Sequence, residues 1–117
     1  LPLALFLRAL AQYSIVGQAV WIHALTMGAI SSLMLAMMMR SSLGHTGRPL
    51  IASSADMSAY LLLQCAAILR VGAGLFPDSL YAAVVTVSGI LWVLAFGSFL
   101  IRYAPMLLQP RADGRLG

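Results

Sequence analysis

Long apolar runs, separated by short polar segments, are the dominant pattern of the chain. A helix needs roughly 20 apolar residues to cross a bilayer core about 30 Å thick. The chain has four apolar runs. The last three reach that length, and the first, at 2–15, is shorter. The pattern predicts an all-α transmembrane helical bundle with three full spans and one partial span. Its expected segments are a partial span at 2–15, full spans at 19–40, 57–75 and 79–103, a polar loop at 41–56 and a polar tail at 104–117.

Composition agrees with a membrane location. Of the 117 residues, 62% are hydrophobic and 9% are charged, whereas a soluble domain carries about 25% charged residues. The lipid bilayer is therefore the expected surroundings of the helices, and a soluble fold is excluded. Because the chain starts inside an apolar run, we expect it to be the last part of a longer protein. The preceding helices of that protein would pack against the helices of this chain.

Positive charge comes from seven arginines without any lysine, and the net charge is +4. Alternating crossings of the three spans bring five of the arginines to one side. By the positive-inside rule, the 41–56 loop and the C-terminus are cytoplasmic. The charge thus indicates topology and not nucleic-acid binding, which needs a basic patch on a soluble surface. The five arginines are Arg40, Arg48, Arg102, Arg111 and Arg115.

Two features predict how the helices begin and pack. Small residues recur every fourth position in the first full span, which creates a face that another helix can approach closely. The polar stretch 53–58 contains Asp56 and is typical of a helix N-terminus. The small residues are Ala24, Gly28, Ser32 and Ala36.

The two histidines are the main candidates for cofactor chemistry. His23 lies one turn inside a span, where a polar side chain is costly and indicates a role; the alternative is an interfacial histidine with one hydrogen bond. His45 lies in the turn Gly44-His45-Thr46-Gly47-Arg48-Pro49, which suits an anion, a haem propionate or a metal, or is only a connector. About 25 Å of helix separates His23 from Arg40. We therefore expect two sites, or one site and a structural histidine, with further ligands from elsewhere.

Arg70 and the methionines allow two interpretations each. Arg70 lies within reach of the membrane interface, so its side chain either extends to water or pairs with a carboxylate or a haem propionate. The methionines of the first full span offer soft thioether ligands for copper, although packing between helices is their commoner role. Met27 is the candidate metal ligand among them because it follows His23 by four residues on the same helix face.

The sequence resembles the C-terminal part of an NnrS family protein. The resemblance rests on His23-Ala24-Leu25-Thr26-Met27-Gly28-Ala29-Ile30, on Arg40, and on Leu43-Gly44-His45-Thr46-Gly47-Arg48-Pro49-Leu50. Proteins of this family are bacterial inner-membrane proteins with about twelve spans, associated with haem, copper and the nitric oxide response. The resemblance implies that His23, His45 and Arg48 take part in haem or copper ligation or in propionate pairing.

Three functions remain open at this stage. The first is a haem- and copper-binding membrane protein of the nitric oxide response. The second is a transporter or channel subunit in which Arg70 and the histidines line a polar pathway. The third is a purely structural assembly partner. Enzymatic turnover has the least support, because the sequence supplies no nucleophile and base together.

Overall fold

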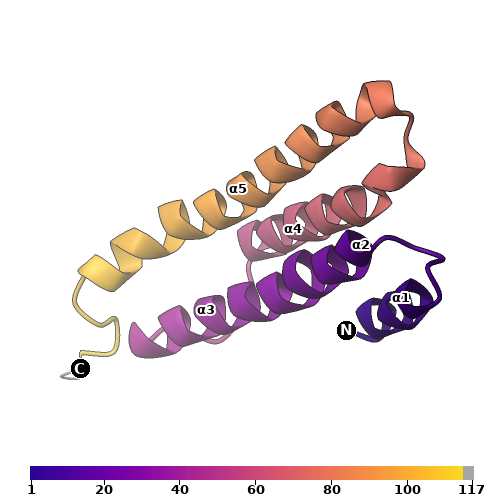
Figure 1. The fold of residues 1–117 in the computed structure, drawn as a ribbon. Helices are drawn as coiled ribbons and strands as arrows, with labels where there is room; N and C mark the ends of the chain where they lie inside the picture. The colour runs from indigo at the N-terminus through magenta and orange to yellow at the C-terminus, as the bar shows by residue number, and fades with distance from the viewer. Residues whose placement is uncertain (115–117) are drawn as a thin grey trace.

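The computed structural model describes residues 1–114, and these residues are helical throughout their ordered elements, without any strand (Figure 1). Arg115, which we expect on the arginine-rich side, lies outside the described residues. The elements are α1 (Pro2–Gln12), α2 (Gln18–His23), the π-helix η1 (Ala24–Ile30), α3 (Ser31–His45), α4 (Ser54–Gly72), the short 3-10 helix η2 (Ala73–Leu75) and α5 (Asp78–Leu108).

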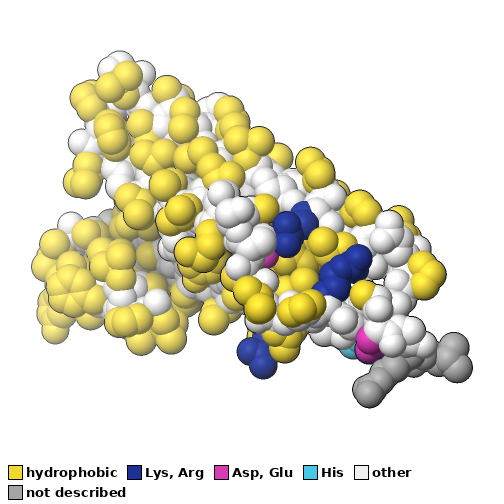
Figure 2. Space-filling model, turned by 180° about the vertical axis from the view of Figure 1, so that it is seen from behind, with side chains coloured by type: hydrophobic (Ala, Val, Ile, Leu, Met, Phe, Trp, Pro, Cys, Tyr) yellow, Lys and Arg dark blue, Asp and Glu magenta, His cyan; other side chains and the backbone are white. Residues whose placement is uncertain are grey.

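Three helices are long and apolar enough to cross a membrane. They are the continuous helix Gln18–His45, which joins α2, η1 and α3, then Ser54–Leu75 and Asp78–Leu108. Apolar side chains cover most of the face shown in Figure 2, as a lipid-facing surface requires. The helix α1 has 11 residues, about 16 Å, too short for a crossing. The fold class predicted from the sequence is confirmed.

The first and last spans are longer than the apolar pattern indicates. The first helix continues beyond residue 40 to His45, so part of the expected 41–56 loop is helical. The last helix passes through Pro105 and ends at Leu108, although proline removes one backbone hydrogen bond and disfavours a helix interior. Pro105 lies in the last turn of α5, so the helix loses one backbone hydrogen bond there and ends three residues later.

The helix α4 begins with a capping box formed by Ser53 and Asp56. The Asp56 backbone N–H donates to Ser53 Oγ at 3.3 Å, and the Ser53 backbone N–H donates to Asp56 Oδ2 at 2.8 Å. Two backbone donors at the start of the helix are thereby satisfied. The polar stretch at 53–58 thus contains the helix start that the sequence indicates.

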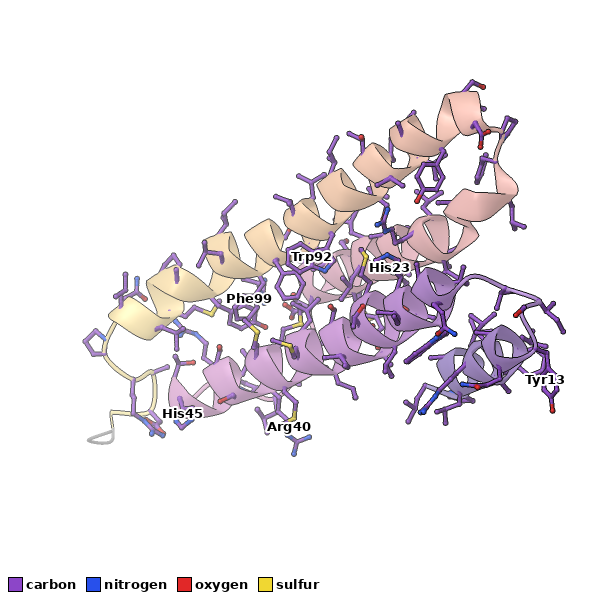
Figure 3. All side chains as sticks on the ribbon, viewed as in Figure 1. Tyr13, His23, Arg40, His45, Trp92 and Phe99 are labelled. Atoms are coloured by element: carbon purple, nitrogen blue, oxygen red, sulfur yellow. The ribbon has the colours of Figure 1, made fainter. Side chains whose placement is uncertain are left out.

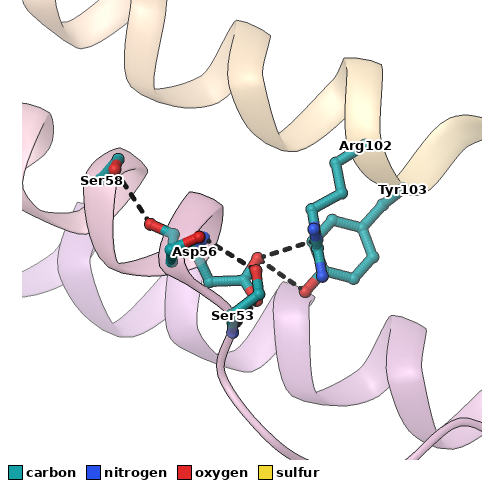
Figure 4. Close-up of polar contacts among 6 residues, drawn as sticks. Ser53, Asp56, Ser58, Arg102 and Tyr103 are labelled. Atoms are coloured by element: carbon teal, nitrogen blue, oxygen red, sulfur yellow. Dashed lines mark hydrogen bonds and ion pairs between the residues drawn. The ribbon is translucent and has the colours of Figure 1, made fainter.

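Asp56 also connects α4 to the end of α5 (Figure 4). Its side chain is only 3% exposed. The Tyr103 hydroxyl donates to Asp56 Oδ1 at 2.9 Å, and Arg102 Nε lies 3.2 Å from the same oxygen. The Arg102 contact is an ion pair whose N–H direction falls outside hydrogen-bond geometry. The carboxylate therefore holds a tyrosine and an arginine from the far end of the last span.

The core lies where α3, α4 and α5 meet. Phe99 and Tyr103 of α5 stack with ring centroids 4.8 Å apart, and Trp92 points toward the same core (Figure 3). Leu35 of α3 and Leu63 of α4 are fully buried beside them. α4 and α5 form the most extensive helix pair. By contrast, α1 packs beside α2 and η1, with Tyr13 directed away from the bundle.

Replacing Tyr103 with phenylalanine tests the link between α4 and α5. Phenylalanine keeps the ring stacking but leaves the buried Asp56 carboxylate without its hydroxyl donor. Because a hydrogen bond to a charged group contributes about 2 kcal/mol, we expect Tyr103→Phe to lower the free energy of unfolding in mixed micelles by about that amount. Tyr81→Phe, at an exposed position on the same helix, is the control and should change little. Equal stability of the two variants would contradict the link.

Candidate cofactor sites

His23 ends α2 and directly precedes the π-helix. Its imidazole is half-buried and makes no hydrogen bond within residues 1–114. Arg70 of α4, also half-buried, lies close enough for the two side chains to interact electrostatically. Figure 3 shows His23 where the first span meets the others. Two of the predicted site residues, from different helices, therefore lie within electrostatic range of each other.

The π-helix Ala24–Ile30 coincides with the whole segment that follows His23 in the first of the two motifs described above. π-Helices are rare and occur mainly as wide turns inside α-helices, often at functional sites. Hydroxyl groups stabilise this one: Thr26 Oγ1 donates to the Ile22 carbonyl at 2.8 Å, and Ser31 Oγ donates to the Thr26 carbonyl at 3.0 Å. The hydrophobic pattern does not indicate this element, although the Thr26 and Ser31 hydroxyls beside Gly28 are a signal for it.

The small-residue stripe of the first span packs against α4 of the same chain. A Cβ atom at Gly28 would lie 3.9 Å from the Ala67 Cβ. Gln64 Nε2 donates to Ser32 Oγ at 2.6 Å, and Ser32 Oγ donates to the Gly28 carbonyl. The close helix approach predicted from the stripe is present. It is reinforced by an interhelical hydrogen bond of the kind that holds membrane helices together.

His45 ends α3 at the opposite end of the same continuous helix, and Gly47 terminates that helix. Gly47 has a φ of +67°, which favours glycine. The Arg48 backbone N–H donates to the Leu43 carbonyl at 3.0 Å, and the Gly47 N–H donates to the Gly44 carbonyl at 3.2 Å. These two bonds form a Schellman motif with Gly47 at its left-handed position. Gly44, which the sequence pattern places in the turn, lies inside α3.

The C-terminal segment packs against this turn. The Ala112 backbone N–H donates to the Thr46 carbonyl at 3.0 Å. The Asp113 carboxylate lies so close to Gly47 that a Cβ atom there would be 2.6 Å from the Asp113 Cγ. Arg111 Nη2 pairs with Asp113 Oδ2 at 2.7 Å, and the hydrogen bonds between the two side chains raise the pKa of Arg111 above its usual value. The glycine at position 47 is therefore required both by its backbone angle and by this contact.

Arg48 is the second candidate residue of the turn, and part of its charge has no partner. The side chain is half-buried, and its Nη1 atom is buried without a hydrogen bond. A buried donor that remains unpaired costs about 1–3 kcal/mol. An anion such as a carboxylate is the group that would satisfy it. His45 beside it is exposed and makes no hydrogen bond within the described part of the chain.

The two histidines lie too far apart to bind one metal ion. They are at opposite ends of one helical stretch, about 30 Å from each other. Within residues 1–114, no group of three His, Cys, Asp or Glu side chains could hold a metal. A metal ion or haem bound at either end would therefore receive a single histidine ligand from the described residues.

The methionines occupy different kinds of position. Met39 is buried in the core, which agrees with a packing role. Met27 lies in η1, half-buried, on the turn that follows His23. The exposed Met37 lines a cavity together with His45. Each candidate histidine therefore has a methionine in its neighbourhood.

Comparison with known proteins identifies one related family. The family model described as NnrS protein matches residues 1–111. The matched region includes His23, the π-helix and the His45 turn. Neither a curated protein nor a solved structure matches the chain.

Substitutions at Gly28 test the close contact between η1 and α4. Alanine adds a Cβ at an ordinary contact distance, so Gly28→Ala should be close to neutral. Leucine overfills the interface, and we expect Gly28→Leu to lower the free energy of unfolding by about 1–3 kcal/mol. Gly89→Leu, where nothing lies within 4 Å of a built Cβ, is the matched control. If both leucine variants unfold at the same point of a mixed-micelle titration, the contact does not contribute to stability.

Proposed function

The chain belongs to the NnrS family, and from that membership we propose that it acts in the bacterial nitric oxide response as a haem- and copper-binding membrane protein. The observation that carries the proposal is the position of His23. Its imidazole makes no hydrogen bond within residues 1–114 and lies near the Arg70 guanidinium of another helix. An imidazole without a hydrogen-bond partner and a guanidinium within electrostatic range of it could supply one ligand to a haem iron and one partner to a haem propionate.

The donor set of this chain fits haem better than it fits copper. Haem brings four nitrogen ligands of its own, so its iron needs only one or two ligands from the protein, and histidine is a common one. Arginine pairs well with a carboxylate such as a haem propionate. When bound, haem would supply an iron position for a small diatomic ligand. His23 would hold the iron, and Arg70 would orient the group by pairing with a propionate.

The His45 end offers a second, similar combination. His45 has an exposed imidazole, and the neighbouring Arg48 has a buried Nη1 atom without a partner. We assign to this end a second cofactor position, with His45 as the ligand and Arg48 as the partner of an anionic group. It is the weaker of the two positions, because an exposed imidazole excludes less water than a half-buried one.

Copper requires more ligands than these residues supply. Soft thioether and imidazole groups suit copper, and His23 with Met27 offers one of each. Because residues 1–114 contain no cluster of three ligating side chains, further helices of the same protein would complete a copper site. Such helices would pack against the spans described here.

We also propose that the chain is part of a multi-pass protein of the inner membrane. In the proposed orientation, the 41–56 loop and the C-terminus face the cytoplasm. The ends of α3 and α5 carry four arginines against two aspartates, whereas Asp78 begins α5 at the other end. This asymmetry supports the positive-inside orientation. The four arginines are Arg40, Arg48, Arg102 and Arg111.

The transporter alternative has less support. It requires Arg70 and the histidines to line one polar pathway. The two histidines lie at opposite ends of the first span, and the cavity of about 700 Å³ along that span is lined mainly by apolar side chains.

Absorption spectra and metal analysis of the full-length protein test the cofactor proposal. We expect a haem band in the wild type and a several-fold lower haem content in His23→Ala, because the iron loses its protein ligand. His45→Ala should retain the haem bound at the His23 end. Gln12→Ala, at an exposed position before the first span, is the control. A wild-type protein without haem, or a His23→Ala variant with full haem content, would refute the assignment.

Cysteine labelling tests the orientation. In a Cys65→Ser background, Ile51→Cys and Leu75→Cys place single exposed thiols at opposite ends of α4. A membrane-impermeant maleimide should label Leu75→Cys in cells with a permeabilised outer membrane. It should label Ile51→Cys only after the inner membrane is broken. The reverse pattern would invert the proposed topology.

A further inference from the structure

Arg40 is a cation without a partner at the edge of the bundle. It lies near the end of α3, is exposed, and makes no hydrogen bond or ion pair within residues 1–114. Figure 3 shows its side chain pointing outward from α3. The other arginine that reaches this region from a helix, Arg102, is already paired with Asp56. Arg40 is therefore free to bind an anion from outside the chain.

An apolar cavity of about 260 Å³ opens beside Arg40. Its walls come from α3, α4 and the segment between them, and they include Met39, Leu43 and Leu50. Asp56 also lines this cavity, but Tyr103, Ser53 and Arg102 satisfy its carboxylate. The uncompensated charge at the mouth of the cavity is therefore positive.

A second cavity, of about 700 Å³, lies along the seam between the first span and α4, and Tyr60 lines both cavities. Small residues from Ala24 to Ser32 form one wall and α4 forms the other, with Leu1 and Leu3 of the N-terminal segment also lining it. We call the two together the α3–α4 furrow. From Arg40 to Ala24 it extends over roughly 20–24 Å, which exceeds the depth of one bilayer leaflet, about 15 Å.

The furrow combines an apolar interior with a positive mouth. Figure 2 shows arginine side chains gathered around an apolar patch toward one end of the molecule. Four arginines lie at that end against two aspartates, and both aspartates are paired with arginines. An amphiphile with a negative head and a long apolar chain matches this distribution of charge and shape.

We propose that the α3–α4 furrow binds one phospholipid with an anionic headgroup. The Arg40 guanidinium pairs with the phosphate, for which its planar donors are well suited. One acyl chain lies along the furrow, outside the Gly28–Ala67 contact and the Gln64–Ser32 hydrogen bond that join the first span to α4. The positive end of the molecule favours a lipid with net negative charge over a zwitterionic lipid of the same chain length.

Native mass spectrometry of the full-length protein tests this proposal. The protein is titrated with phosphatidylglycerol or with phosphatidylethanolamine carrying the same acyl chains. We expect the wild type to retain one phosphatidylglycerol in preference to phosphatidylethanolamine. Arg40→Gln should weaken phosphatidylglycerol binding about fivefold, the effect of one surface cation near anionic lipid, and should remove the preference. Ala36→Phe narrows the furrow and should weaken the binding of both lipids.

Matched control variants distinguish changes in the furrow from the loss of any arginine or the addition of any aromatic ring. Arg8→Gln removes an exposed arginine at the other end of the chain, and Ala83→Phe adds a ring at an exposed position of α5. Neither should change lipid binding. Equal binding of both lipids to the wild type, or unchanged binding in Arg40→Gln and Ala36→Phe, would overturn the proposal. A protein dimer that Ala36→Phe dissociates would also overturn it, because a second copy would then occupy the furrow.

Discussion

The negative charge of Asp56 has to be compensated, and much of the arrangement of the bundle follows from how this is done. A buried ion costs several kcal/mol unless partners satisfy it. One carboxylate oxygen closes the capping box that starts α4, and the other accepts from Tyr103 and pairs with Arg102. The first turn of α4 is thereby held at the depth of the last turns of α5. With α4 fixed in this way, its other face meets the small-residue side of the first span.

The number of spans could be predicted from the sequence, because in lipid every backbone group must be satisfied within the helix, but the first and last helices extend beyond the expected ends. The start of α4 was also visible, since Ser53 and Asp56 are close in sequence and act locally. The partners of Asp56 on α5 were not visible, because they are 46 and 47 residues away and no local rule pairs them. The continuation of α5 through Pro105 to Leu108 was not visible either, because proline disfavours a helix interior.

The candidate sites likewise have some features that could be predicted from the sequence and others that could not. Helix rise alone places His23 and His45 far apart, so their separation could be predicted from the sequence. That Arg70 approaches His23 depends on how α4 packs against the first span, and that Arg48 retains an unpaired buried nitrogen depends on the conformation of the turn. In both places the chain supplies a cation beside a histidine.

The wide turn at Ala24–Ile30 gives the first span a property that a regular helix lacks. A π-turn contains one residue more than the α-helical turn it replaces, so it can move along a helix while both ends stay in place. Each residue that it passes rotates by about 100°, the angle between neighbouring residues. His23 stands at the edge of this turn. A shift of the turn toward the N-terminus would swing the imidazole to a different face, while the contact of Gly28 and Ser32 with α4 anchors the rest of the helix.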